Sequence, residues 1–111
     1  MNRHWNAHCV LSLVHFMAYP ECQSGEGPIL ESVARIAEDD FFSGIEISRI
    51  NDDQTLKQVA DLLAQTYMQV AFGAQPVILG GKLNLNSADK AERSHAVNAV
   101  ASQIQRAVDL G

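Results

Sequence analysis

The stretch that decides the fold is residues 44–74, GIEISRINDDQTLKQVADLLAQTYMQVAFGA. Residues 45–48 alternate apolar with polar side chains, which is typical of a short strand. Residues 51–53, Asn-Asp-Asp, then offer an N-cap and place acidic charge at the positive end of a helix dipole. The apolar face of that helix is formed by Leu56, Val59, Ala60 and Leu63. Residues 69–74 form the next strand, so the stretch predicts a strand, a helix and a second strand in that order.

The same strand and helix unit is expected on either side of this stretch. Residues 9–17 are a mostly apolar run that suits a strand buried on both faces. A loop over residues 19–27 follows, and Pro28 begins a helix that runs to Phe41-Phe42. After a loop that contains Pro76, Gly80 and Gly81, Asn86 or Ser87 can cap a third helix that ends at Gly111. The core face predicted for this third helix is Val97, Val100, Ala101, Ile104 and Val108.

The predicted fold class is α/β, with three consecutive βα units and parallel strands, because strands joined through helices need crossover connections. A complete (β/α)8 barrel takes about 250 residues, and the chain has 111. A fourth strand is expected to begin where the chain stops. We therefore expect residues 1–111 to form a single partial domain that cannot close a barrel alone. Residues 1–8 are expected to be loosely ordered, although His4 and His8 share helical spacing.

The overall charge argues against one class of partner. The chain carries 13 acidic and 8 basic residues, a formal charge of −5, which provides no electrostatic footprint for a nucleic-acid backbone. Cys9 and Cys22 lack the spacing of a zinc or redox motif and are interpreted as ordinary thiols. The apolar run from Cys9 to Tyr19 is too short to span a membrane. A cytoplasmic protein that binds neither nucleic acid nor membrane is the expectation.

Three elements carry a resemblance to a known family: Phe42-Ser-Gly-Ile-Glu-Ile47, Gly73-Ala-Gln-Pro76 through Leu83-Asn-Leu-Asn86, and Ala107-Val-Asp-Leu-Gly111. With these elements in this order, the chain resembles the N-terminal part of the xylose-isomerase-like TIM barrels, a superfamily of sugar and sugar-phosphate isomerases and epimerases. The resemblance spans Val10 to Gly111. It implies a small sugar or sugar phosphate as substrate and a divalent metal (Mn, Mg, Co or Zn). The family's metal ligands come mainly from later strands, so none is assigned to this chain, and the chain alone is expected to be inactive.

Position within such a barrel selects four candidate substrate-binding residues: His15, Glu46, Arg49 and Gln75. Each is expected near the C-terminal end of a strand, where barrel enzymes gather their chemistry. The imidazole of His15 suits a sugar hydroxyl or acid–base work, although a histidine in an apolar strand is commonly a core residue. The carboxylate of Glu46 needs a partner, which is either substrate or a structural cation such as Arg49. Gln75 either hydrogen-bonds hydroxyls or orders its own loop.

Two other functions remain open. The first is a non-catalytic binding or assembly module, because a third strand without a fourth leaves unpaired backbone groups, and a homo-oligomer would cover them. The second is an endonuclease acting at abasic sites in DNA, a reaction class found in the same superfamily. The acidic charge of the chain argues against the endonuclease.

Overall fold

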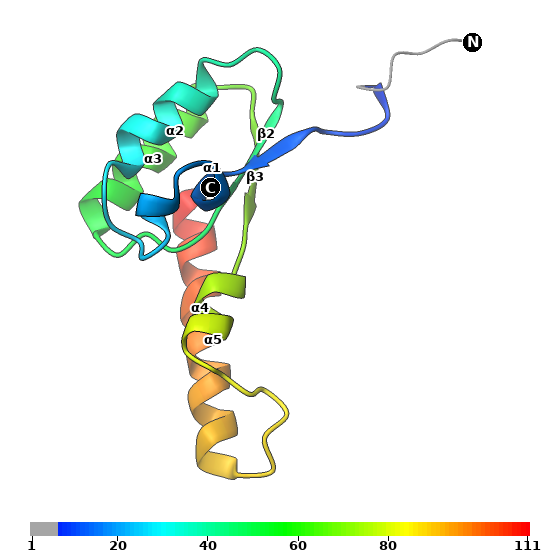
Figure 1. Ribbon diagram of the computed structural model, residues 1–111, viewed down its shortest axis with the longest axis vertical. Coiled ribbons are helices and arrows are strands. Elements are labelled where there is room, and N and C mark those ends of the chain that lie inside the picture. The colour runs from blue at the N-terminus through cyan, green and yellow to red at the C-terminus, as the bar shows by residue number, and fades with distance from the viewer. Residues whose placement is uncertain (1–6) are drawn as a thin grey trace.

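The computed structural model describes residues 7–111, and the centre of the fold is a three-stranded parallel sheet (Figure 1). Its strands are β1 (Ser12–Val14), β2 (Gly44–Ile47) and β3 (Gln69–Phe72), in the order β1-β2-β3. The prediction of a parallel α/β arrangement is therefore confirmed. Most of the predicted loosely ordered segment, His4 included, lies outside the described residues.

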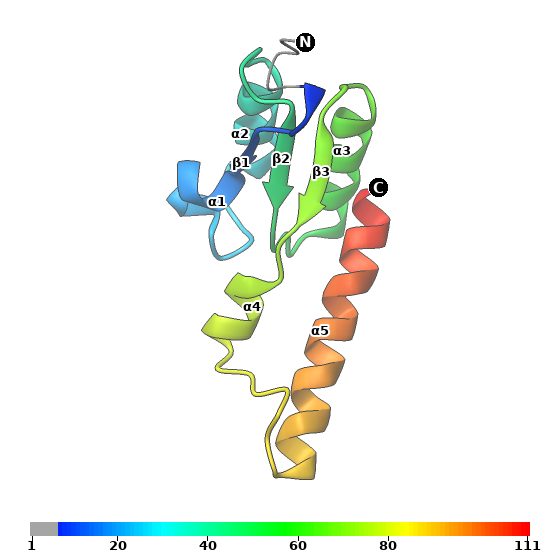
Figure 2. The same cartoon turned by 90° about the vertical axis from the view of Figure 1, so that its right-hand side faces the viewer.

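Two helices, α2 (Ile29–Ala37) and α3 (Asp53–Ala64), cover one face of the sheet (Figure 2). Because side chains alternate along a strand, Ile45 and Ile47 of β2 point to this face, where both are fully buried. Val33 of α2 and Val59 of α3 are 0% exposed and belong to the same core cluster. The opposite face of the sheet therefore carries the intervening residues, which the register places in rows: Val14 beside Glu46, and Glu46 beside Ala71.

The helix boundaries follow local capping chemistry. Asp52 is the N-cap of α3, and its carboxylate accepts hydrogen bonds from the hydroxyl and the backbone N–H of Thr55, each at 2.7 Å. These two bonds hold the pKa of the Asp52 carboxyl below its ordinary value. The helix predicted to reach Phe41-Phe42 ends at Ala37 instead. Phe41 is largely exposed and stacks edge-on against Phe42.

The first strand is shorter than the predicted run of residues 9–17. It pairs over only three residues, and the chain then turns into α1 (His15–Ala18) and the 3-10 helix η2 (Pro20–Cys22). The side chain of His15 bonds to Ser32 on α2, so the chain leaves the sheet at this residue. The apolar run had suggested that His15 is a strand residue, whereas in the structure it is the first residue of the helix α1.

The C-terminal half departs most from the prediction. The expected loop after β3 is the short helix α4 (Gln75–Gly80), and the last helix is α5 (Lys90–Leu110). Asp89 is the N-cap of α5, and not Asn86 or Ser87, because the Asp89 carboxylate accepts from the N–H of Glu92 at 2.9 Å. Ser87 supports this cap by donating its hydroxyl to the carboxylate of Glu92.

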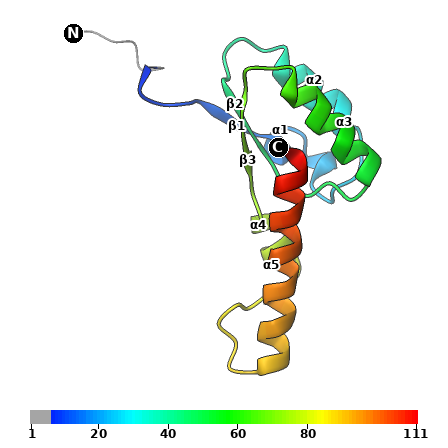
Figure 3. The same ribbon diagram turned by 180° about the vertical axis from the view of Figure 1, so that it is seen from behind.

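The predicted core face of α5 is wrong. Val97, Ile104 and Val108 are at least half exposed, whereas the buried residues of α5 are Ala96 and Leu110. The helix touches α3 and α4 and otherwise extends away from the sheet layer (Figure 3). Its remaining apolar side has no element to pack against within residues 7–111.

The strands form an open sheet and not a closed barrel. A radius of gyration of 15.8 Å exceeds the value of about 13 Å typical of a compact chain of about 100 residues. Within the described part of the chain, no helix is both long and apolar enough to cross a membrane.

Candidate functional site

A pocket of about 470 Å³ lies at the C-terminal ends of the strands. This is the end of a parallel sheet where ligands usually bind. The residues that line it come from the end of β1, from α1, from the loop after η2, from β2 and from α4. They are Val14, Phe16, Met17, Gln23, Glu46, Gln75, Pro76, Leu79 and Gly80. Two of the four predicted site residues, Glu46 and Gln75, are among them.

Glu46 reaches the pocket because it is the one residue of β2 near the strand's end that points away from α2 and α3. Its neighbours Ile45 and Ile47 are buried beneath the helices, so the alternation of the strand fixes its direction. The half-buried side chain of Glu46 has no hydrogen-bond or ion-pair partner within residues 7–111. Its carboxylate is therefore open to a ligand.

Gln75 meets Glu46 over the backbone of Gly73. A Cβ atom placed on Gly73 would clash with Oε1 of Glu46 and would lie 2.7 Å from Oε1 of Gln75. The glycine thus lets two side-chain oxygens from different elements approach the same point of the chain. Gln75 is the first residue of α4, and Pro76 at the second position suits a helix start, which fixes the direction in which the amide leaves β3.

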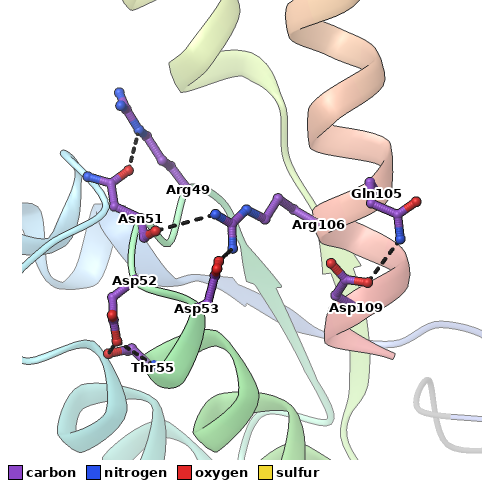
Figure 4. Close-up of polar contacts among 8 residues, drawn as sticks. All are labelled: Arg49, Asn51, Asp52, Asp53, Thr55, Gln105, Arg106 and Asp109. Carbon is purple, nitrogen blue, oxygen red and sulfur yellow. Dashed lines mark hydrogen bonds and ion pairs between the residues drawn. The ribbon is translucent and has the colours of Figure 1, made fainter.

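Arg49 does not line this pocket and does not pair with Glu46. Its Nε donates to Oδ1 of Asn51 at 2.7 Å (Figure 4). The Asn51 amide in turn donates to the backbone carbonyl of Ser24 and to the carboxylate of Glu26, each at 3.2 Å. The structural pair of Glu46 with Arg49 that the sequence offered is absent among the described residues. Arg49 instead bonds to Asn51, and Asn51 ties the loop after β2 to the loop after η2.

His15 is also outside the pocket lining, and its side chain is 3% exposed. Ser32 Oγ donates to the backbone oxygen of Pro28 or Ile29, at 2.8 and 3.0 Å. Nε2 of His15, 2.7 Å from Ser32 Oγ, therefore carries a proton and donates to it. Burial lowers the pKa of His15 more than the nearby Glu21 carboxylate raises it, so the neutral imidazole is favoured. Its ring stacks on Tyr19, 5.8 Å away between centroids.

The remaining walls of the pocket were missed by sequence reasoning. Met17 is 70% exposed and lies on α1, where the sequence predicted a strand. Leu79 is 75% exposed and lies on α4, where the sequence predicted a loop. Pro76, a few residues after the strand, was the available indication of a helix start. Gln23 adds a second amide to the lining.

The residues present do not form a metal site. Among residues 7–111, no three His, Cys, Asp or Glu side chains gather in an arrangement that would hold a metal ion. Glu46 is the one acidic residue among those that line the pocket. Of the pair His4 and His8 considered from the sequence, His4 lies outside the described residues. The polar groups that line the pocket are the carboxylate of Glu46 and the amides of Gln23 and Gln75, and these can hydrogen-bond a ligand that also contacts the apolar walls.

Comparison of the chain with protein-family models, with curated proteins and with solved structures finds no match.

Proposed function

We propose that this chain is the substrate-binding N-terminal portion of a sugar or sugar-phosphate isomerase or epimerase of the xylose-isomerase-like kind. One observation carries the proposal. The pocket at the C-terminal ends of the parallel strands receives the unpaired carboxylate of Glu46 and the amide of Gln75 side by side. A concave, largely apolar site with a few converging polar groups is the usual form of a small-molecule site.

The two polar groups suit hydroxyl groups in particular. The Glu46 carboxylate accepts hydrogen bonds only, and the Gln75 amide both accepts and donates, so adjacent hydroxyls of a sugar can satisfy both residues. The apolar walls formed by Val14, Pro76 and Leu79 suit the C–H faces of the same molecule. The role of these residues is to bind and orient the sugar.

The resemblance also implies a divalent metal that polarises substrate oxygens. Residues 7–111 do not supply its ligands, so the proposal assigns this chain no step that depends on the metal. The chain by itself is expected to bind a sugar without converting it.

Binding is tested by ligand-observed NMR with D-xylose and D-fructose as probes. Saturation transfer to the sugar is expected for the unchanged chain. Glu46→Ala and Gln75→Ala should each raise the dissociation constant about tenfold, the cost of roughly one hydrogen bond to a charged or polar partner. Gln58→Ala, an exposed position within α3, is the matched control and should bind like the unchanged chain. No saturation transfer from either sugar would contradict the proposal.

A second candidate function, assembly with another copy of this chain, is favoured by a specific surface. We call it the α5 stripe: Val97, Ala101, Ile104 and Val108, all exposed. Its spacing of four, three and four residues is the heptad spacing with which helices pair. The stripe is self-complementary, because in an antiparallel pair Val97 of one copy would lie opposite Val108 of the other, and Ala101 opposite Ile104.

The residues that flank the α5 stripe would not oppose such a pairing. They are uncharged: Asn98 and Gln105 on one side, Val100 and Ala107 on the other. At 1.5 Å per residue the stripe is only about 17 Å long, well short of a standard interface, so a weak dimer is expected.

Sedimentation velocity over a concentration series tests this second candidate. The unchanged chain should shift from monomer to dimer as its concentration rises. Ile104→Glu should stay monomeric, and Ser102→Glu, on the same helix outside the stripe, should behave like the unchanged chain. A chain that is monomeric at every concentration would exclude self-association.

A further inference from the structure

The charge of the pocket lining distinguishes between the two ligand classes that the proposed function leaves open. Of the side chains that line the pocket, Glu46 is the only charged one, and it is negative. The others are apolar or are the amides of Gln23 and Gln75. A phosphate group entering this space would meet a carboxylate and no cation.

None of the cations of the surrounding elements lines the pocket. Nε of Arg49 donates to Asn51, and Arg106 pairs with Asp53 at the start of α3 (Figure 4). Arg35 pairs with Glu31 at 2.6 Å on α2. Lys82, two residues after α4, is exposed and does not line the pocket.

Backbone donors do not replace the missing cation. Phosphate sites without a lysine or arginine commonly use the free N–H groups at the start of a helix. The helices that border the pocket, α1 and α4, have only four and six residues. Pro76 at the start of α4 also lacks a backbone N–H, so one of the donors that a phosphate would need is absent.

We infer that the pocket selects the neutral, unphosphorylated sugar and rejects its phosphate ester, with the Glu46 carboxylate as the residue that discriminates. This inference rests on the proposed function, because it assigns a substrate class to the same site. Two like charges about 5 Å apart at a partly wet site repel strongly enough to weaken binding about tenfold or more.

The test compares D-fructose with D-fructose 6-phosphate on the full chain by NMR titration at low salt. The dissociation constant of the phosphate should exceed that of the sugar about tenfold or more. Raising the salt concentration should reduce this ratio, because salt screens charge repulsion but not a steric clash. Glu46→Gln keeps the size of the side chain and should bring the ratio close to one.

Glu38→Gln is the matched control. It removes the same charge at an exposed position just after α2, at the other end of the sheet from the pocket, so the ratio should stay as in the unchanged chain. The salt series is measured on the unchanged chain, so it tests the same charge repulsion even if the Glu46→Gln variant does not fold.

The outcomes separate this inference from the proposed function. If neither compound binds, the proposed function fails. If both bind equally well, the sugar site stands and the inference is overturned. A preference for fructose that survives both high salt and Glu46→Gln would also overturn it, because charge would then not be the cause.

Discussion

Gly73 holds the two polar groups of the pocket together, because any larger residue would occupy the space of their oxygens. In Gly73→Ala the atoms nearest to the new methyl group belong to the ends of two flexible side chains, Glu46 and Gln75, which can move away. We expect the free energy of unfolding to change by about 1 kcal/mol or less, whereas sugar binding should weaken about tenfold as the oxygens separate. Urea denaturation and NMR titration measure the two effects. A loss of stability without a loss of binding would assign Gly73 a role in the fold alone.

His15 is expected to make stability depend on pH. Burial lowers its pKa in the folded chain below the ordinary 6.5, so the unfolded chain binds a proton more readily. The folded state should therefore lose stability as the pH falls through about 6.5, and the loss should be complete below the folded pKa. His15→Gln, whose amide can still donate to Ser32, should show a smaller loss between about pH 7.5 and about pH 5 in urea denaturation.

His95→Gln serves as the control for this measurement, since it makes the same substitution at an exposed histidine of α5. An equal pH dependence in His15→Gln and the unchanged chain would place its origin in other groups.

At the scale of single residues, the sequence predicted those positions that a regular element fixes. Glu46 lies between two isoleucines on a strand, so its face follows from alternation alone. Arg49 and His15 lie just past the ends of strands, where no regular element fixes the direction of the side chain. Arg49 donates to Asn51 two residues on, and Asn51 is held in turn by Ser24 and Glu26, whereas His15 bonds to Ser32 on α2. The distant partners, Ser24, Glu26 and Ser32, cannot be read from local spacing.

The docking of α5 depends on one apolar residue and one polar link. Leu110 is 3% exposed in the core cluster, and Arg106 bonds to Asp53 and to the backbone oxygen of Asn51 (Figure 4). Asp53 is 88% exposed, so solvent screens the ion pair. We expect Leu110→Ala to lower the free energy of unfolding by about 2 kcal/mol and Arg106→Gln by about 1 kcal/mol or less.

Urea denaturation of the two variants compares these costs. If Arg106→Gln proved the more destabilising change, the polar link, and not burial of Leu110, would be what holds α5 against α3.

At the scale of elements, periodicity predicted the helices α2 and α3 and the strands β2 and β3, because each of these elements buries one side against the same core. It also predicted a helix where α5 lies, but not which face of that helix is buried, because the apolar residues of α5 cover a wider arc than its neighbours can bury. The sequence shows that arc but not which part of it faces α3, which is decided by Ala96, Leu110 and the polar link of Arg106. The α4 segment was missed because its six residues are too few to display a helical period.

The partial burial of α5 contributes to the extended shape of the molecule, together with the described segment before β1 (Figure 1). A chain of this size that packed all its helices on the sheet would have a radius of gyration near 13 Å, whereas α5 projects from the layer and the radius is 15.8 Å (Figure 3). The projection leaves the α5 stripe exposed along most of its length. The exposure of the stripe and part of the extended shape are thus two consequences of one arrangement.

Small-angle X-ray scattering of Ile104→Glu tests this arrangement on a chain that should not self-associate. The radius of gyration should stay close to 15.8 Å at every concentration, because the charge on the stripe prevents pairing without changing how Leu110 and Arg106 dock α5. The unchanged chain should match this value when dilute and exceed it as it concentrates, since an antiparallel pair extends beyond either copy. A dilute radius near 13 Å would mean that α5 folds back onto the sheet and covers the stripe within one chain, which would remove the surface for self-association.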